Sequence, residues 1–196
     1  MKRKLYMIRH GRTVANDRNL YYGATDLEVS PEGRAQLELL RRERTYPDIS
    51  GCTVYTSGMK RTQETLEVLY PGVTAVPEPM VSEMNFGKFE MRSYEEMKSD
   101  PEYIAWITGD YLKNVCPEGE SPEEHSRRAV EGFKKILSET QGDVMVIAHN
   151  GSMTAFMQYL FPDEGENRWY WNRYPLCCWA FCLMSVSLQP IFLKQK

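Results

Sequence analysis

The tripeptide Arg9-His10-Gly11 directly follows an apolar run at residues 5–8. A neutral imidazole can attack a phosphorus atom, and a neighbouring guanidinium can hold the phosphoryl oxygens. The apolar run is typical of a buried strand, so the tripeptide is expected at a strand end. An Arg-His pair in this position is also compatible with a solvated loop. Other polar residues must therefore converge on His10 before the tripeptide indicates a site.

Polar residues follow two further predicted strands. His149 comes directly after residues 144–148, and Ser57 comes directly after residues 52–56. Arg61 lies in the first turn of the helix expected next. In open parallel sheets, ligands bind outside the carboxyl ends of the strands. The chain contains three histidines, and two of them occupy equivalent strand ends. The sequence therefore predicts one polar site at this edge of the sheet.

These residue types suggest a phosphoryl-transfer site. Arg9 and Arg61 can clamp a phosphoryl group, and their charges favour a neutral His10 with a free ring nitrogen. His149 and the amides of the helix that follows it can stabilise the equatorial oxygens. The leaving oxygen needs a proton, and Glu83 in the loop 81–87 is the candidate donor. From the residues alone, a surface glutamate is an equal alternative.

Strands and helices alternate along the chain. Strands are expected at 4–8, 52–56, 73–76 and 144–148, with closing strands at 179–188 and 190–193. Ser30 with Pro31 predicts a helix start that runs to about Arg44. Further helices are expected at 59–69, from the capping box at 121–124, and at 152–160. This order predicts a single α/β domain over residues 1–196, a three-layer α/β/α sandwich with a mostly parallel central sheet. Residues 84–120 are expected to form a short helical insertion over the active site.

Composition narrows the class of protein. The 24 basic and 27 acidic residues nearly balance, so no nucleic-acid partner is expected. No apolar run is long enough for a membrane span or a signal-peptide core, which predicts no membrane association. The five cysteines lack metal-ligand spacing and are expected to be small apolar filler in a reduced, cytoplasmic protein.

Taken in order, the motifs resemble the histidine phosphatase superfamily, which includes cofactor-dependent phosphoglycerate mutases and small phosphatases. The resemblance covers nearly the whole chain. It rests on Arg9-His10-Gly11-Arg12-Thr13 with Asn16, Gly23-Ala24-Thr25-Asp26-Leu27 continuing through Ser30-Pro31-Glu32-Gly33 to Gln36, Tyr55-Thr56-Ser57-Gly58-Met59-Lys60-Arg61-Thr62 with Thr65, Glu83-Met84-Asn85-Phe86-Gly87, Pro117-Glu118-Gly119-Glu120-Ser121 with Arg128, and Ala148-His149-Asn150-Gly151.

The resemblance implies a phosphoglycerate-mutase-like fold in which His10 is the phosphorylated nucleophile and Glu83 the proton donor. It implies that Arg9, Arg61 and His149 form the phosphate pocket, with no metal and no cofactor. It also implies secondary substrate contacts, namely Asn16, Gly23, Ser57 and Asn150.

The sequence departs from the family pattern at two places. Arg12 stands where relatives often carry an acidic residue, and we expect it to contact a second anionic group of the substrate; a surface variation is the alternative. The segment Phe89-Glu90-Met91-Arg92 replaces the commoner Trp-Glu-Gly, so a reshaped wall is expected after Glu83.

The short stretch between Glu83 and His149 favours hydrolysis over mutase activity, since mutases of the family usually carry a longer insertion there. The expected substrate is a small phosphorylated metabolite: a sugar phosphate, a phosphoglycerate or the phosphate of α-ribazole. Phosphoglycerate mutase and a catalytically inactive phospho-ligand binding module are the alternatives. A metal-dependent hydrolase is disfavoured because the histidines lack ligand spacing.

Two further features are given structural interpretations. His125, in the first turn after Ser121, is expected to be a solvated helix residue. The aromatic residues 169–171, Tyr174 and 179–181 are expected to pack the final strands. A pocket wall and a homodimer contact are the alternatives for that aromatic segment.

Overall fold

The computed structural model describes residues 2–43, 46–162, 177, 179–185 and 190–195. Its strands form one six-stranded sheet in the order β3-β2-β4-β1-β5-β6. Strands β1 to β4 run parallel to one another, and β5 is antiparallel to both β1 and β6. The strand bounds are Lys2–Arg9 for β1, Thr53–Thr56 for β2, Val76–Pro77 for β3, Val144–Ala148 for β4, Trp179–Ser185 for β5 and Pro190–Gln195 for β6.

The helices begin where the sequence places capping residues. Ser30 Oγ accepts a hydrogen bond from the Gly33 amide at 3.1 Å, and Ser121 and Glu124 form the expected capping box. The helix bounds are Val14–Asp17 for α1, Pro31–Arg42 for α2, Lys60–Leu69 for α3, Tyr94–Met97 for α4, Pro101–Ile107 for α5, Pro122–Glu139 for α6 and Asn150–Leu160 for α7, with 3-10 turns at Pro79–Val81 and Gly87–Phe89.

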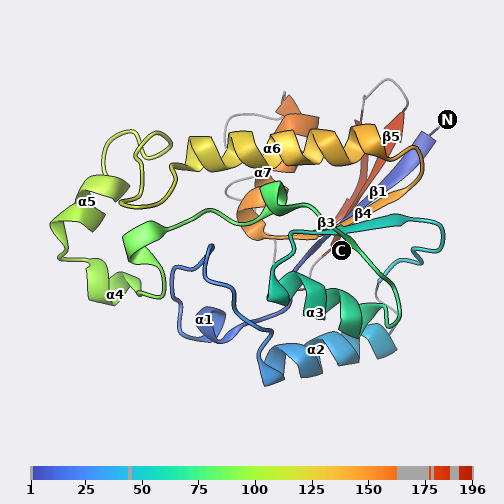
Figure 1. Cartoon of the computed structure of the whole chain (residues 1–196), viewed down its shortest axis with the longest axis horizontal. Coiled ribbons are helices and arrows are strands. Elements are labelled where there is room, and N and C mark those ends of the chain that lie inside the picture. The colour runs from blue at the N-terminus through green and yellow to red at the C-terminus, as the bar shows by residue number, and fades with distance from the viewer. Residues whose placement is uncertain (1, 44–45, 163–176, 178, 186–189, 196) are drawn as a thin grey trace.

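The side chains of the central strands alternate between two cores, as the two-residue period of a strand requires. Leu5 and Met7 of β1 pack in the core that α6 and α7 cover. Tyr6 and Ile8 pack in the core that α2 and α3 cover. Figure 1 shows these two helix pairs on opposite sides of the sheet. The fold is therefore the expected three-layer α/β/α sandwich with a mostly parallel sheet.

The segment 84–120 builds a small aromatic core of its own, away from the sheet (Figure 1). Its buried side chains come from the loop after Glu83, from α4 and α5, and from the turn before α6: Met84, Phe89, Met97, Tyr103, Trp106 and Cys116. Backbone hydrogen bonds join Tyr21 to Met91 and Arg92. The segment is thereby fixed to the loop that follows α1.

The position of the third strand differs from the prediction. The third strand was expected at 73–76, but β3 comprises Val76–Pro77 and pairs with Tyr55 and Thr56. The expected position was wrong because the turn after α3 extends to Val73, whose amide donates to the Tyr70 carbonyl. The strand then ends at Pro77 because Glu78 caps a 3-10 turn directly afterwards. Residues 169–171 and Tyr174 lie outside the described residues, so their packing stays a prediction.

Candidate active site

The pairing of β1 with β4 brings two histidines together. Arg9 pairs with Ala148 at the ends of these parallel strands. The amide of His10 donates to the Ala148 carbonyl at 3.1 Å, and His149 is the N-cap residue of α7. The ring centroids of His10 and His149 lie 5.2 Å apart. The two strand ends therefore converge on one site, as the sequence predicts.

His10 has the protonation state that a nucleophile needs. Its side chain is buried, and Nδ1 lies 2.7 Å from the Gly11 carbonyl oxygen. A carbonyl can only accept, so Nδ1 carries the proton and the neutral ring keeps its lone pair on Nε2. Burial, followed by the charges of Arg61 and Arg9, holds the His10 pKa well below its usual value. The ring is therefore neutral at pH 7.

Arg61 is fully buried and organises the neighbouring groups. Its Nε donates to His149 Nδ1 at 3.3 Å, so His149 carries its proton on Nε2, which faces Ser57 Oγ at 2.9 Å. Its two terminal nitrogens donate to the carbonyls of Gly23 and Thr25. Burial and the charge of Arg61 hold the pKa of His149 well below its usual value. His149 is thus a neutral donor in the site.

Glu90 is a site-forming residue to which the sequence analysis gave no role. Its carboxylate accepts hydrogen bonds from the amides of residues 23–25 and from the Phe86 amide. It therefore fixes the loop whose carbonyls bind Arg61. Gly23 allows close approach to the insertion, because a Cβ there would lie 1.7 Å from the Met84 carbonyl oxygen. Glu90 keeps the glutamate of the commoner Trp-Glu-Gly pattern although the residues beside it differ, and this was the signal in the sequence that could have indicated its role.

Glu83 lies beside the start of α7. Its Oε2 accepts from the Gly151 amide at 3.1 Å and its Oε1 from the Met84 amide at 3.1 Å. Arg128 pairs with Glu120 through two hydrogen bonds and also donates to the Glu83 carbonyl. The loop carrying Glu83 is therefore held from both α6 and α7.

The remaining predicted contacts differ in their surroundings. Asn16 Oδ1 accepts from Thr13 and from the Tyr22 hydroxyl. The Tyr22 ring centroid lies 5.0 Å from Cζ of Arg61 and 6.2 Å from the His10 ring centroid. The Arg12 guanidinium pairs with Asp17 on the surface. Asn16 is thus connected to the histidine pair by Tyr22, whose ring lies beside His10. Arg12 lies at the surface, at the edge of the candidate site.

The prediction for His125 was wrong. The side chain is 3% exposed, and its Nε2 lies 3.2 Å from the Ser82 carbonyl oxygen and 3.7 Å from Glu83 Oε1. The first turn of α6 faces the Glu83 loop, so the residue is enclosed although its sequence neighbours are charged. Burial lowers its pKa despite the neighbouring Glu83.

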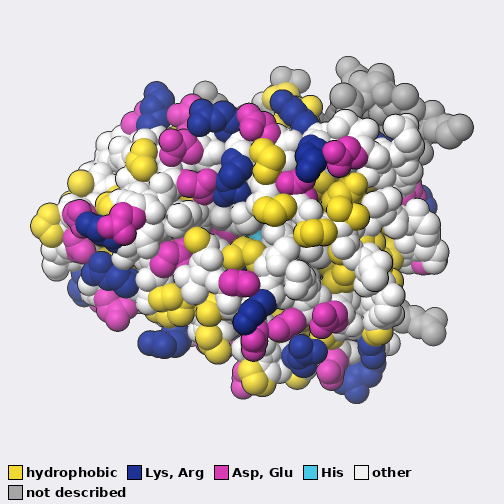
Figure 2. All heavy atoms as spheres, in the orientation of Figure 1, with side chains coloured by type: hydrophobic (Ala, Val, Ile, Leu, Met, Phe, Trp, Pro, Cys, Tyr) yellow, Lys and Arg dark blue, Asp and Glu magenta, His cyan; other side chains and the backbone are white. Residues whose placement is uncertain are grey.

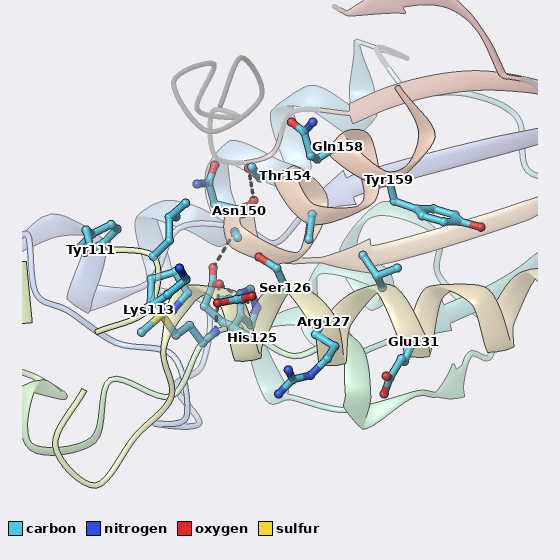
Figure 3. Close-up of a pocket in the computed structure, with 18 of the residues that line it drawn as sticks. Tyr111, Lys113, His125, Ser126, Arg127, Glu131, Asn150, Thr154, Gln158 and Tyr159 are labelled. Atoms are coloured by element: carbon cyan, nitrogen blue, oxygen red, sulfur yellow. Dashed lines mark hydrogen bonds and ion pairs between the residues drawn. The ribbon is translucent and has the colours of Figure 1, made fainter. Parts of the chain in front are cut away.

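A cavity of about 1070 Å³ extends from Arg9, Glu83 and Asn150. In Figure 3, α7 contributes Asn150, Thr154 and Gln158 to its wall, and α6 contributes Ser126 and Arg127. Apolar side chains complete the lining: Met84, Phe86, Leu112, Val130 and Ala155. Figure 2 shows basic and acidic side chains interspersed over the face of the molecule that is seen in Figure 1. Arg9 and Glu83 therefore adjoin a large cavity whose lining is of mixed polarity.

The described residues lack two features that define other classes of protein. They contain no group of three or more His, Cys, Asp and Glu side chains arranged to hold a metal ion. Among the helices that the structure describes, none is long and apolar enough to cross a membrane.

The chain belongs to the histidine phosphatase superfamily (branch 1), whose sequence pattern it matches over residues 5–184. It is similar to the adenosylcobalamin/alpha-ribazole phosphatase of Escherichia coli, with 31% identity over 90% of this chain and 88% of that protein. The alpha-ribazole phosphatase of Shigella flexneri has a similar structure, with a TM-score of 0.84, 26% identity, and coverage of 98% of this chain and 95% of that one. The human 6-phosphofructo-2-kinase/fructose-2,6-bisphosphatase 1 is 31% identical over 89% of this chain but only 36% of its own length. The family and these relatives make this protein a phosphoric monoester hydrolase.

Proposed function

We propose that this protein is a metal-independent phosphatase that hydrolyses a small phosphomonoester through a phosphohistidine on His10. The observation that carries the proposal is the state of His10: a buried, neutral ring with its lone pair on Nε2, beside two arginines. This is the combination that in-line attack on phosphorus requires.

In the first step, the lone pair of His10 Nε2 forms a bond to phosphorus as the bond between phosphorus and the ester oxygen breaks. Arg9 and Arg61 hold the phosphoryl oxygens, and the Nε2–H group of His149 donates a hydrogen bond to one of these oxygens. Glu83 gives its proton to the departing oxygen, which leaves as a neutral alcohol. The product is phosphohistidine with Glu83 ionised.

In the second step, water attacks the phosphohistidine on the face that the alcohol has vacated. Glu83 takes a proton from this water, the phosphorus–nitrogen bond breaks, and its electron pair returns to His10 Nε2. Inorganic phosphate leaves, and both residues regain their starting states. No metal or redox partner enters this balance.

The cavity beside Glu83 and Arg9 supports a bulky leaving group. A phosphoglycerate is small and strongly anionic, whereas this lining combines apolar side chains with charges of both signs. A leaving alcohol with an aromatic or heterocyclic part therefore suits the cavity better. Among the substrates considered, the phosphate of α-ribazole fits this description, and the names of the relatives in Escherichia coli and Shigella flexneri agree with it.

Asn16, Gly23, Ser57 and Asn150 are proposed as secondary contacts. The open cavity also favours hydrolysis over mutase chemistry, because water can reach the phosphohistidine.

A phosphate-release assay in the presence of a chelator tests the proposal. The panel should contain α-ribazole phosphate, sugar phosphates and both phosphoglycerates. We expect turnover to persist in chelator, to be highest for the bulky ester, and to be lost in His10→Ala. Equal release by wild type and His10→Ala would contradict the proposal. Isomerisation of phosphoglycerate at a higher rate than hydrolysis would favour the mutase, and phosphate binding without turnover would favour a binding module.

A further inference from the structure

His125 is a buried histidine with no role in the two steps above. It lies in the first turn of α6, and its Nε2 faces three oxygen atoms: the Ser82 carbonyl at 3.2 Å, Ser152 Oγ at 3.5 Å and Glu83 Oε1 at 3.7 Å. Because the Ser82 carbonyl can only accept, Nε2 carries the ring proton. This N–H therefore donates to the backbone carbonyl that precedes Glu83, and Glu83 Oε1 lies 3.7 Å from the same nitrogen.

The surroundings of His125 restrict its movement. Ser152 Oγ donates to the same Ser82 carbonyl at 3.1 Å. On the other side, a Cβ at Gly151 would lie 2.8 Å from His125 Cε1 and 2.3 Å from Glu83 Oε1. The imidazole and the Glu83 carboxyl are thus packed together against the start of α7. Figure 3 shows His125 among the residues that line the cavity, and Glu83 belongs to the same lining.

The chemical consequence concerns the charge that Glu83 acquires during the reaction. When Glu83 gives up its proton, a carboxylate forms on a side chain that is only 13% exposed. The amides of Met84 and Gly151 donate to this carboxylate. The N–H of His125 adds the positive end of a fixed dipole 3.7 Å from Oε1, where it stabilises developing negative charge.

We propose that His125 is a positioning residue for Glu83, which orients the Glu83 carboxyl and stabilises its charge as the proton passes to the leaving oxygen. The inference rests on the proposed function, because it requires Glu83 to be the proton donor. It makes His125 important only for substrates whose leaving oxygen needs a proton.

Leaving-group dependence separates this role from plain packing. The p-nitrophenolate ion is a weak base and leaves without a proton, whereas an alkoxide does not. In His125→Leu, we expect kcat for an alkyl phosphate to fall about tenfold and kcat for p-nitrophenyl phosphate to change less than about twofold. His125→Gln can place an amide N–H near the position of Nε2, so it should restore most of the alkyl rate.

A buried control on the same helix is Phe133→Leu, which removes packing in the main core without touching Glu83. It should leave the ratio of the two rates unchanged. In the double variant Glu83→Gln/His125→Leu, the alkyl rate should equal that of Glu83→Gln alone, because His125 acts through Glu83.

The outcomes distinguish this inference from the proposed function. If Glu83→Gln slows both substrates equally, the role of Glu83 as proton donor is wrong. If Glu83→Gln slows the alkyl substrate selectively but His125→Leu and His125→Gln slow both substrates alike, the role of His125 is wrong. Thermal unfolding of each variant establishes that the folded protein was assayed.

Discussion

The backbone amide of Gly151 donates a hydrogen bond to the Glu83 carboxylate at 3.1 Å, joining residues 68 positions apart in the chain. Gly151 lies two residues after His149, in the first turn of α7. The helix that begins beside His149 therefore also holds the proposed proton donor. The start of α7 therefore fixes the distance between His149 and the Glu83 carboxylate.

Gly151→Ala tests that relationship. A Cβ at this position would lie 2.3 Å from Glu83 Oε1 and 2.8 Å from His125 Cε1, so the carboxyl must leave its observed position. Alanine suits a helix better than glycine, so the free energy of unfolding should fall little or not at all. We expect kcat for an alkyl phosphate to fall about tenfold to a hundredfold in a protein with an almost unchanged melting temperature. Full activity in this variant would show that the position of Glu83 is not limiting.

The three histidines make stability depend on pH. Burial lowers the pKa of His10, His125 and His149 in the folded protein. Below the unfolded-state pKa of about 6.5, the unfolded chain therefore binds more protons than the folded one. The free energy of unfolding should be nearly independent of pH above about pH 7.5 and fall at lower pH, with a slope that approaches about 1.4 kcal/mol per pH unit for each histidine.

Urea denaturation between pH 5 and 8 measures this slope. His10→Gln removes one of the three titrating rings. The slope of the free energy of unfolding against pH should therefore be about one third smaller below pH 6.5. A variant slope as steep as that of wild type would mean that His10 protonates in the folded protein as readily as in the unfolded chain.

Met91 has a backbone φ of 60°, in the left-handed region that glycine favours. This is the position at which the commoner family pattern has glycine. This conformation costs about 1–2 kcal/mol for a residue with a side chain. Glycine avoids that cost, but it loses more conformational entropy on folding, which offsets part of the stabilisation. Met91→Gly should therefore raise the free energy of unfolding by up to about 1 kcal/mol. The matched control is Met91→Ala, which removes the side chain but keeps the strained conformation and should not stabilise the protein.

Arg12 is expected to contact a second anionic group of the substrate. Its surface pair with Asp17 contributes little free energy, so substrate can displace it at small cost. Arg12→Gln should raise KM severalfold for esters with a second anion and leave KM unchanged for esters without one. Asp17→Asn should lower KM for the anionic esters. Equal effects of Arg12→Gln on the KM of both kinds of ester would show that Arg12 does not bind a second anionic group of the substrate.

The sequence predicted the layered fold and the histidine pair because both depend on local patterns. The apolar runs at 5–8 and 144–148 define β1 and β4, and the parallel pairing of these strands then places His10 beside His149. Ser30 and Ser121 mark the helix starts for the same reason: a cap depends on residues close in the sequence.

The parts that the sequence did not predict depend on distant segments. His125 has charged neighbours along the chain, and its burial results from the packing of α6 against the loop at Ser82 and Glu83. Glu90 binds amides that are up to 67 positions away. Neither contact has a local pattern, so only the folded arrangement reveals it.

The central claim is that the phosphoryl group passes through His10. Rapid acid-free quenching of wild type with an ester labelled in its phosphoryl group, followed by peptide mapping, tests this claim most directly. We predict label on the peptide that contains His10, stable in base and labile in acid, formed in chelator and absent from His10→Ala. Turnover without labelled protein, or label on a residue other than His10, would contradict the account.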